Sequence, residues 1–278
     1  MTVQTVVEEN AVTALQRSRG AGRLSAVLLD GKVRLKDLYQ QGNAKLRVPR
    51  GHGRDVLEAV MINTAGGMTG GDDLSWEFDA GPGATLCLTT QASEKIYRSS
   101  AGTADTTIIL KAGSGSRVSW LPQETILYDR CSFRRTIHAE LDRTSEALFI
   151  EPVVFGRTAM NEQVFAGSVR DRWRIYSDGE LIHAEDFAIE GRIADTLKSD
   201  AVAGGAGALA TVLLVSRKAE VHLDDARRLT GKAGGASAWH GKLLIRLIAK
   251  NGYELRNRLM PIVQLLDPQT AIPKLWTL

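Results

Sequence analysis

The amino-acid sequence predicts a mainly β protein that carries a smaller α+β part at its C-terminal end. Residues 23–189 are a succession of short apolar or alternating runs separated by glycine. Their period is close to two and they are rich in β-branched and aromatic residues, which is typical of strands. Turn signals such as Asp30-Gly31 and Asp178-Gly179 recur throughout this stretch. These features fit a sandwich, a barrel or a β-solenoid, and the spacing does not distinguish the three.

The sequence changes character after Val215. The segment that starts at Leu223 carries acidic residues first, basic residues next and glycine last, an order that predicts a short helix. Residues 242–249 predict a strand. Residues 252–267 have apolar side chains at helical spacing, and we expect Pro261 to kink or divide that helix.

We therefore expect three parts along the chain. They are a flexible N-terminal segment over residues 1–22, a β body over residues 23–200 and an α+β part over residues 201–278 that packs on the body. The longest uncharged run, residues 201–215, contains three glycines and is shorter than the ~18 to 20 apolar residues of a membrane span. It predicts a loop that leads into a buried strand. No internal repeat recurs at a fixed period, so an array of equal repeats is not supported.

The composition argues against several classes of protein. There are 35 Lys and Arg residues against 32 Asp and Glu, and no stretch combines basic clusters with aromatics, so we expect no nucleic-acid partner. Cys87 and Cys131 are far apart and outside any C-x-x-C pattern, which favours reduced thiols. The N-terminus has acidic residues where a signal peptide would be basic. We expect a cytoplasmic protein with no membrane association.

Two glycine-rich segments resemble phosphate-binding loops but have the wrong spacing. Gly235 and Gly241-Lys242 are one residue too far apart for G-x-x-x-x-G-K, and Leu243 stands where a magnesium-binding Ser or Thr belongs. The glycines of residues 66–71 lack G-x-G-x-x-G spacing and predict a turn between strands. We therefore expect no nucleotide hydrolysis by this chain.

The histidines do not form a metal-binding motif. They occur singly, without H-x-H, H-E-x-x-H or a Cys/His grouping, so no tightly bound metal or cofactor is expected. They are His52, His138, His183, His222 and His240. No G-x-S-x-G elbow occurs either, and nucleophilic catalysis has no positive indication.

Carboxylates remain as candidates for chemistry. Four of them, Glu124, Asp129, Glu151 and Glu162, lie in one stretch of the chain. Two facing carboxylates could serve a glycosidase or lyase built on a β-solenoid. Arginines such as Arg130 and Arg157 are close in sequence, which favours carboxylate–guanidinium pairs instead. The aromatics of this stretch are expected in the core, namely Trp120, Phe133, Phe149 and Phe155.

Four segments together resemble the urease accessory protein UreD family, which is also called UreH. They are NTAGGMTGGD (residues 63–72), TTQASEKIYRS (89–99), WLPQETILYDR (120–130) and FGRTAMNE (155–162). They occur in the order and spacing of the family, and the resemblance is close over residues 23–191 and looser beyond. Two positions depart from the family pattern: Asn161 stands where glycine is usual, and Ser119 where glutamate is common. Both departures concern the expected local turns.

The resemblance implies a fold and a function. The fold would be stacked, solenoid-like sheets with a small helical part. The function would be non-catalytic: family members bind apo-urease and the accessory protein UreF, which brings in the GTPase UreG, and together they deliver nickel to the urease active site. A homodimer within that complex is compatible with this role. A carbohydrate-active β-solenoid enzyme is the alternative reading, and an adaptor without a metal role is a second.

The resemblance also implies a transient passage of nickel through the body of the protein. Such a passage needs weak oxygen and imidazole ligands, because a closed site would retain the ion. We expect the candidates within residues 120–162, and they are Glu124, Asp129, His138, Glu151 and Glu162. For any one of these residues a purely structural ion pair is the favoured reading.

Overall fold

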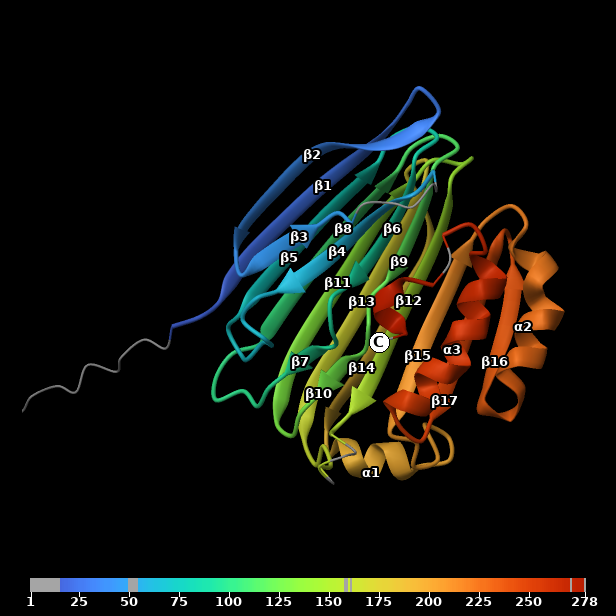
Figure 1. The fold of residues 1–278 in the computed structure, drawn as a ribbon. Coiled ribbons are helices and arrows are strands. Elements are labelled where there is room, and N and C mark those ends of the chain that lie inside the picture. The colour runs from blue at the N-terminus through green and yellow to red at the C-terminus, as the bar shows by residue number, and fades with distance from the viewer. Residues whose placement is uncertain (1–15, 50–54, 158–159, 161, 271, 278) are drawn as a thin grey trace, which may run out of the picture.

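The protein is described from a computed structural model, which covers residues 16–49, 55–157, 160, 162–270 and 272–277. Two β-sheets face each other, and helices cover part of one of them (Figure 1). Within the described residues, no helix is both long and apolar enough to cross a membrane.

Sheet A has seven strands among the described residues, in the spatial order β14-β13-β11-β8-β5-β1-β2. They are β1 (Arg19–Leu29), β2 (Lys32–Gly42), β5 (Asp73–Ala80), β8 (Ala104–Ala112), β11 (Cys131–Leu141), β13 (Gly167–Ser177) and β14 (Glu180–Gly191). The inner strands are parallel, whereas β2 and β14 pair antiparallel at the two edges.

Sheet B runs in the order β16-β17-β15-β12-β9-β6-β4-β3, and the short strands β10 and β7 extend it beside β12. Its strands are β3 (Ala44–Arg47), β4 (Leu57–Asn63), β6 (Thr85–Thr90), β7 (Glu94–Ile96), β9 (Arg117–Leu121), β10 (Thr125–Leu127), β12 (Glu146–Phe155), β15 (Ala208–Val215), β16 (Gly234–Trp239) and β17 (Lys242–Ala249). The helices are α1 (Ile193–Lys198), α2 (Leu223–Thr230) and α3 (Gly252–Leu266), with short 3-10 turns at Ala219–His222, Gly231–Ala233 and Lys274–Trp276.

The middle of the chain winds between the two sheets as successive coils. Strand β5 of sheet A is followed by β6 and β7 of sheet B, then β8 by β9 and β10, and β11 by β12. Strands of neighbouring coils lie parallel, with Asp73 opposite Asp105 in sheet A and Thr85 opposite Arg117 in sheet B. This is the stacked arrangement of a β-solenoid, so the fold implied by the family resemblance is confirmed.

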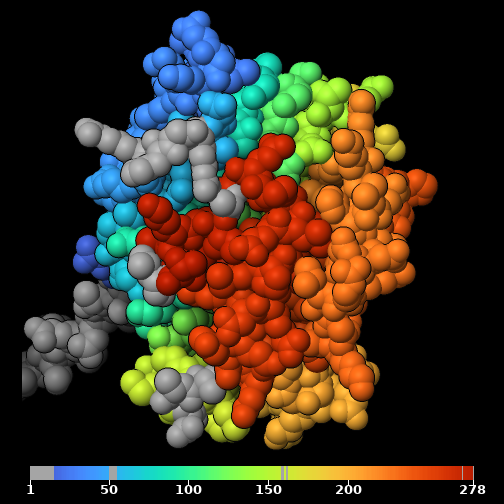
Figure 2. Space-filling view, turned by 45° about the vertical axis from the view of Figure 1, so that its right-hand side comes forward, coloured from blue at the N-terminus to red at the C-terminus, as the bar shows by residue number. Residues whose placement is uncertain are grey.

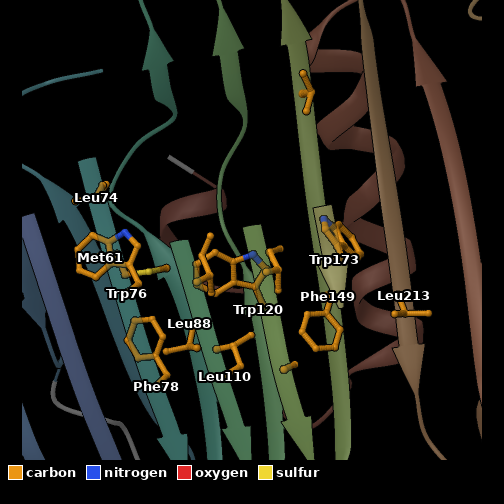
Figure 3. Close-up of a cluster of buried hydrophobic side chains, with 14 of the residues drawn as sticks. Met61, Leu74, Trp76, Phe78, Leu88, Leu110, Trp120, Phe149, Trp173 and Leu213 are labelled. Carbon is orange, nitrogen blue, oxygen red and sulfur yellow. The ribbon is translucent and has the colours of Figure 1, made fainter. Parts of the chain in front are cut away.

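The main core fills the space between the sheets. Alternate residues of the strands point inward, as the period of two requires, and large aromatic and aliphatic side chains from both sheets meet there (Figure 3). The predicted core aromatics Trp120, Phe133, Phe149 and Phe155 are all buried. The interior is thus packed largely by apolar side chains.

A second core lies on the other face of sheet B. Helix α3 and the residues after it cover the middle of this face, shown in red in Figure 2. Leu255, Leu259 and Ile262 of α3 are buried against strands that include β12 and β15. Strand β12 is therefore buried on both faces, which explains its almost continuous apolar sequence.

The C-terminal elements largely match the sequence-based expectations. The helix from Leu223, the strand over residues 242–249 and the helix from Gly252 are all present. Asn251 caps α3 by accepting a hydrogen bond from the backbone N–H of Glu254. Pro261 does not divide α3, which continues to Leu266. Strands β15, β17 and β16 continue sheet B, so residues 201–278 share a sheet with the β body.

Tight turns close the hairpins at both edges of sheet A. Asp30-Gly31 and Asp178-Gly179 all have positive φ, the backbone of a two-residue hairpin turn. Of the expected N-terminal segment, residues 1–15 lie outside the described residues, and Arg19 already begins β1. Cys87 and Cys131 are buried free thiols.

Candidate functional site

A charged cluster interrupts the apolar interior between the sheets. Arg135 lies on the inward face of β11, and Asp171 lies beside it in register on β13. Glu151 reaches the same guanidinium from β12 in sheet B, where its Oε2 lies 2.5 Å from Nη1 of Arg135. Nη2 of Arg135 donates a hydrogen bond to Oδ2 of Asp171. Arg135, Glu151 and Asp171 are only 5%, 2% and 6% exposed, so all three charges are withdrawn from water.

Neighbouring side chains complete part of this cluster. The indole N–H of Trp120 donates to Oε1 of Glu151 at 2.7 Å, and that of Trp173 donates to Oδ1 of Asp171 at 2.9 Å. Nη1 of Arg135 donates to the hydroxyl of Thr125 on β10 at 3.0 Å. Nε of Arg135 makes no hydrogen bond to any described residue, and among these residues Oε2 of Glu151 contacts only Nη1 of Arg135. The three ionic groups are thus close together but incompletely hydrogen-bonded.

Burial and neighbouring charges together raise the pKa of both Glu151 and Arg135. Burial raises the pKa of the Glu151 carboxyl above its ordinary value, and the nearby positive charge of Arg135 opposes this only in part. Burial acts to lower the pKa of Arg135, but the charges of Asp171 and Glu151 outweigh it, so the guanidinium stays protonated. With all three groups charged, the cluster carries one excess negative charge.

Sheet B is interrupted beside Glu151. The pairing of β12 with β9 ends where Phe149 faces Trp120, and the pairing of β12 with β10 begins where Val153 faces Thr125. Pro152, which has no N–H to donate, lies in this interval. On this edge β12 has no strand neighbour at Glu151, whereas on its other edge β15 pairs without a break and places Thr211 opposite Glu151.

A second carboxylate, Glu94, is half-buried on β7, which pairs with β10. Oε1 of Glu94 accepts a hydrogen bond from the side-chain amide of Asn63 at 3.0 Å. Burial raises the pKa of Glu94 to about 7, and the bond from Asn63 opposes that shift only in part. A small cavity of about 130 Å³ adjoins Glu94 and Asn63, with Trp76 and Thr90 among its other walls.

Glu124 occupies the outer side of sheet B and is held by α3. Nε and Nη2 of Arg256 both donate to its carboxylate, which also accepts a hydrogen bond from Ser93. A groove of about 470 Å³ adjoins this pair, with Tyr253 and Arg157 also on its rim. Because Glu124 directly precedes Thr125, the outer pair and the interior cluster lie on the two sides of one short strand.

The other predicted ligands lie apart from the interior cluster. Asp129 pairs with its neighbour Arg130 and accepts a bond from the backbone of Ala166. Glu162 pairs with Arg157 at 2.5 Å.

His138 lies on the outward face of β11, 3.2 Å from the carboxylate of Glu140. The structure therefore does not bring the five candidates together, and Glu151 is the candidate placed in the interior cluster.

The predicted carboxylate–guanidinium pairs are present, although the partners often differ. Arg130 and Arg157 take the expected roles, whereas Arg134 pairs with Asp105 on the outer face of sheet A. The partners of Glu151 and Glu124 are Arg135 and Arg256.

Arg135, Asp171 and Arg256 were not identified from the sequence. The alternation of the strand does indicate that Arg135 points inward, because it lies in phase with Phe133 and Ile137.

A further ionic group fixes α3 to sheet B. Asp267, which follows the helix and is fully buried, lies 3.0 Å from Nε of Arg117 on β9. Its carboxylate also accepts bonds from Ser119 and Thr270. Ser119 thus lies inside a strand and contacts Asp267, not in a turn as expected, while Asn161 lies outside the described residues.

The glycine-rich segments have the structural roles expected of them. Residues 234–249 form the hairpin of β16 and β17, with its turn at His240-Gly241. The glycines of residues 66–71 lie between β4 and β5, and Gly66, Gly67 and Gly71 have positive φ. Among the described residues no group of three or more His, Cys, Asp or Glu side chains could hold a metal ion.

The fold and the site define a mainly β, solenoid-like protein whose two sheets enclose a buried ionic cluster. Residues 18–277 match the family described as "UreD urease accessory protein". The chain therefore belongs to the UreD family of urease accessory proteins.

Similar proteins named urease accessory protein UreD include one from Mesorhizobium japonicum, 50% identical over 267 residues, which cover 95% of each chain. Another, from Agrobacterium fabrum, is 45% identical over 95% of this chain and 92% of the relative. A third, from Rhizobium johnstonii, is 47% identical over 96% of this chain and 98% of the relative.

Proposed function

We propose that the chain is a non-catalytic scaffold in urease maturation. It binds apo-urease and the accessory proteins UreF and UreG in the cytoplasm, forms a homodimer within that complex, and assists GTP-dependent insertion of nickel into the urease active site. Membership of a urease accessory family over nearly the whole chain supports this role. A carbohydrate-active enzyme is not favoured, because the carboxylates considered for it are each paired with arginine.

The observation that supports a nickel passage is Glu151 in the interior. It is a carboxylate on the inner face of a strand, it lies beside an interruption in sheet B, and a second carboxylate is close by. Two carboxylates bind nickel weakly, which suits transfer because a complete ligand set would retain the ion. We assign Glu151 an interior position on this passage and Glu124 a position at its outer groove.

The remaining candidates would contribute at the surface. Glu162 reaches the rim of the outer groove through Arg157. Asp129 lies in the turn after β10, and His138 lies on the outer face of sheet A. Their contribution to nickel transfer should accordingly be smaller than that of Glu151.

Glu151→Gln separates transfer from structure. The amide keeps the volume of the side chain, and the remaining pair of Arg135 and Asp171 is electrically neutral, so the free energy of unfolding should change by no more than about 1 kcal/mol. Assembly with UreF, UreG and apo-urease should persist. Urease activation at limiting nickel should fall about tenfold or more and recover in part with excess nickel.

Glu190→Gln is the matched control for this experiment, because it makes the same change at an exposed position of β14, where Glu190 pairs with Arg170. Activation with this control should equal that of the wild type. Normal activation by Glu151→Gln at limiting nickel would exclude Glu151 from the passage.

The scaffold role also predicts that the purified chain does not hydrolyse GTP. Its glycine-rich hairpin at residues 234–249 has no loop-to-helix phosphate site. Phosphate release would be measured across the chromatographic peak of the isolated chain. Hydrolysis that coincides with this peak in the absence of UreG would contradict the proposal.

A further inference from the structure

We propose that Glu151 and Asp171 form an occluded binding site for a divalent cation, and that the guanidinium of Arg135 occupies this site in the resting protein. Arg135 would then be a positioning residue that keeps the interior closed until a metal ion displaces it. This inference rests on the proposed nickel passage, and Arg135 is the residue that would regulate it.

The geometry shows one cation shared by two carboxylates from different sheets. Glu151 comes from β12 of sheet B and Asp171 from β13 of sheet A, and both contact the end of the Arg135 side chain. When Glu151 and Asp171 are both ionised, the two carboxylates and one guanidinium leave one negative charge unbalanced in a buried site. A divalent cation in place of the guanidinium would balance both carboxylates, so the fixed charges of the site match a double positive charge better than a single one.

The hydrogen bonding of Arg135 is incomplete for a purely structural arginine. Its Nε makes no hydrogen bond to the described residues, although the whole side chain is nearly excluded from water. Nη1 divides its contacts between the hydroxyl of Thr125 and Oε2 of Glu151. An unpaired buried donor is costly, so the guanidinium is held less firmly than its charge contacts suggest.

The ligands available after displacement are the two carboxylates and the hydroxyl of Thr125. Oxygen ligands of this kind accept nickel, and a set of two carboxylates is too small to bind it permanently. The interval in the pairing of β12 at Pro152 lies directly beside Glu151. The outer groove at Glu124 lies across the same short strand, and there Arg256 pairs with Glu124 through two nitrogens.

The test is nickel binding by untagged, full-length Arg135→Gln, measured by equilibrium dialysis and by thermal unfolding. Without metal, the two uncompensated carboxylates should lower the melting temperature. Nickel should restore it in a saturable manner, and the affinity should exceed that of the wild type at least about tenfold. Adding Glu151→Gln or Asp171→Asn to this variant should abolish the gain.

Arg134→Gln is the matched control, because Arg134 is the neighbouring residue on the same strand and pairs with Asp105 on the outer face. It should gain no nickel affinity. An Arg135→Gln variant that binds nickel no better than the wild type, or that keeps its gain after both carboxylates are replaced, would overturn the proposal.

Arg135→Lys covers the case in which Arg135→Gln does not fold. A lysine keeps the charge but cannot bridge two carboxylates as a planar fork does, so its nickel affinity should rise a few-fold. No rise in this folded variant would equally overturn the proposal.

The result is independent of urease activation. Nickel binding by Arg135→Gln together with normal activation by Glu151→Gln would retain the cation site and refute the passage.

Discussion

Arg135 and Arg117 each contact two carboxylates, yet the two arginines are held differently. All three guanidinium nitrogens of Arg117 are engaged: Nε with Asp267 at 3.0 Å, Nη1 with Glu146, and Nη2 with the backbone carbonyl of Leu266 at 2.8 Å. In Arg135 only the two Nη atoms make hydrogen bonds to described residues. The group around Arg117 joins α3 to sheet B. The guanidinium of Arg135, in contrast, is the cation that we propose a metal ion displaces.

The largest loss of stability is expected in the Arg117 group, where every guanidinium nitrogen makes a hydrogen bond. Asp267→Asn removes a fully buried charge that Arg117 and two hydroxyl groups contact, so the free energy of unfolding should fall by about 3 to 5 kcal/mol. Urea or thermal unfolding measures this loss, and added nickel should not restore it.

Arg23→Gln breaks the exposed ion pair with Glu77 and serves as the control, with a change below about 1 kcal/mol. If Asp267→Asn costs no more than this control, the assignment of the Arg117 group as a structural anchor is wrong.

A pH-dependent effect of intermediate size is expected at Glu94. Its folded-state pKa of about 7 lies above the ordinary value of 4.5, so the folded protein binds the proton more tightly and loses stability as the pH rises through this window. Glu94→Gln cannot ionise and should remove that slope. Above about pH 7 the variant should be more stable than the wild type by on the order of 2 kcal/mol, and near pH 4.5 the two should converge.

Urea unfolding across this pH range, with the exposed Glu140→Gln as the reference, measures the difference. Parallel stability profiles for Glu94→Gln and the wild type would show that burial does not shift this carboxyl. The experiment also separates Glu94 from the Arg135 cluster, because no arginine is among the groups that shift its pKa.

The smallest effect is expected at the surface pair of Arg157 and Glu162. Both side chains retain contact with solvent, so Glu162→Gln should change the free energy of unfolding by less than about 1 kcal/mol. Thermal unfolding in low and high salt is the measurement. A loss comparable with that of Asp267→Asn would mean that the pair supports the body as a buried group does.

The sequence predicts the local elements of this fold well, because they depend on near neighbours. The hairpin turns at Asp30-Gly31 and Asp178-Gly179 and the capped helix α3 follow from short-range rules. The stacking of coils does not, because neighbouring coils differ in length. Contacts between adjacent coils join residues 31 positions apart at Ser93 and Glu124 but 36 apart at Arg135 and Asp171, so no fixed period exists to be detected.

The residues of the candidate site could likewise be predicted from the sequence only in part. Glu151 lies within residues 120–162, the stretch in which the sequence predicts the nickel ligands. Arg135 and Asp171 occupy the inward phase of alternating strands, but only the strand register shows that they lie side by side. Asp267 follows a helix and gives no sequence signal that its partner is Arg117, 150 positions away.

Strand β12 separates the core under α3 from the space between the two sheets, and its successive residues point into one or the other. Ile150 belongs to the core under α3, and the next residue, Glu151, belongs to the ionic cluster on the other side. Successive side chains of a strand point to opposite faces, so these two residues are joined by one peptide bond while their side chains lie in different compartments. The packing of the helical layer and the ionic cluster therefore meet at adjacent backbone positions of one strand.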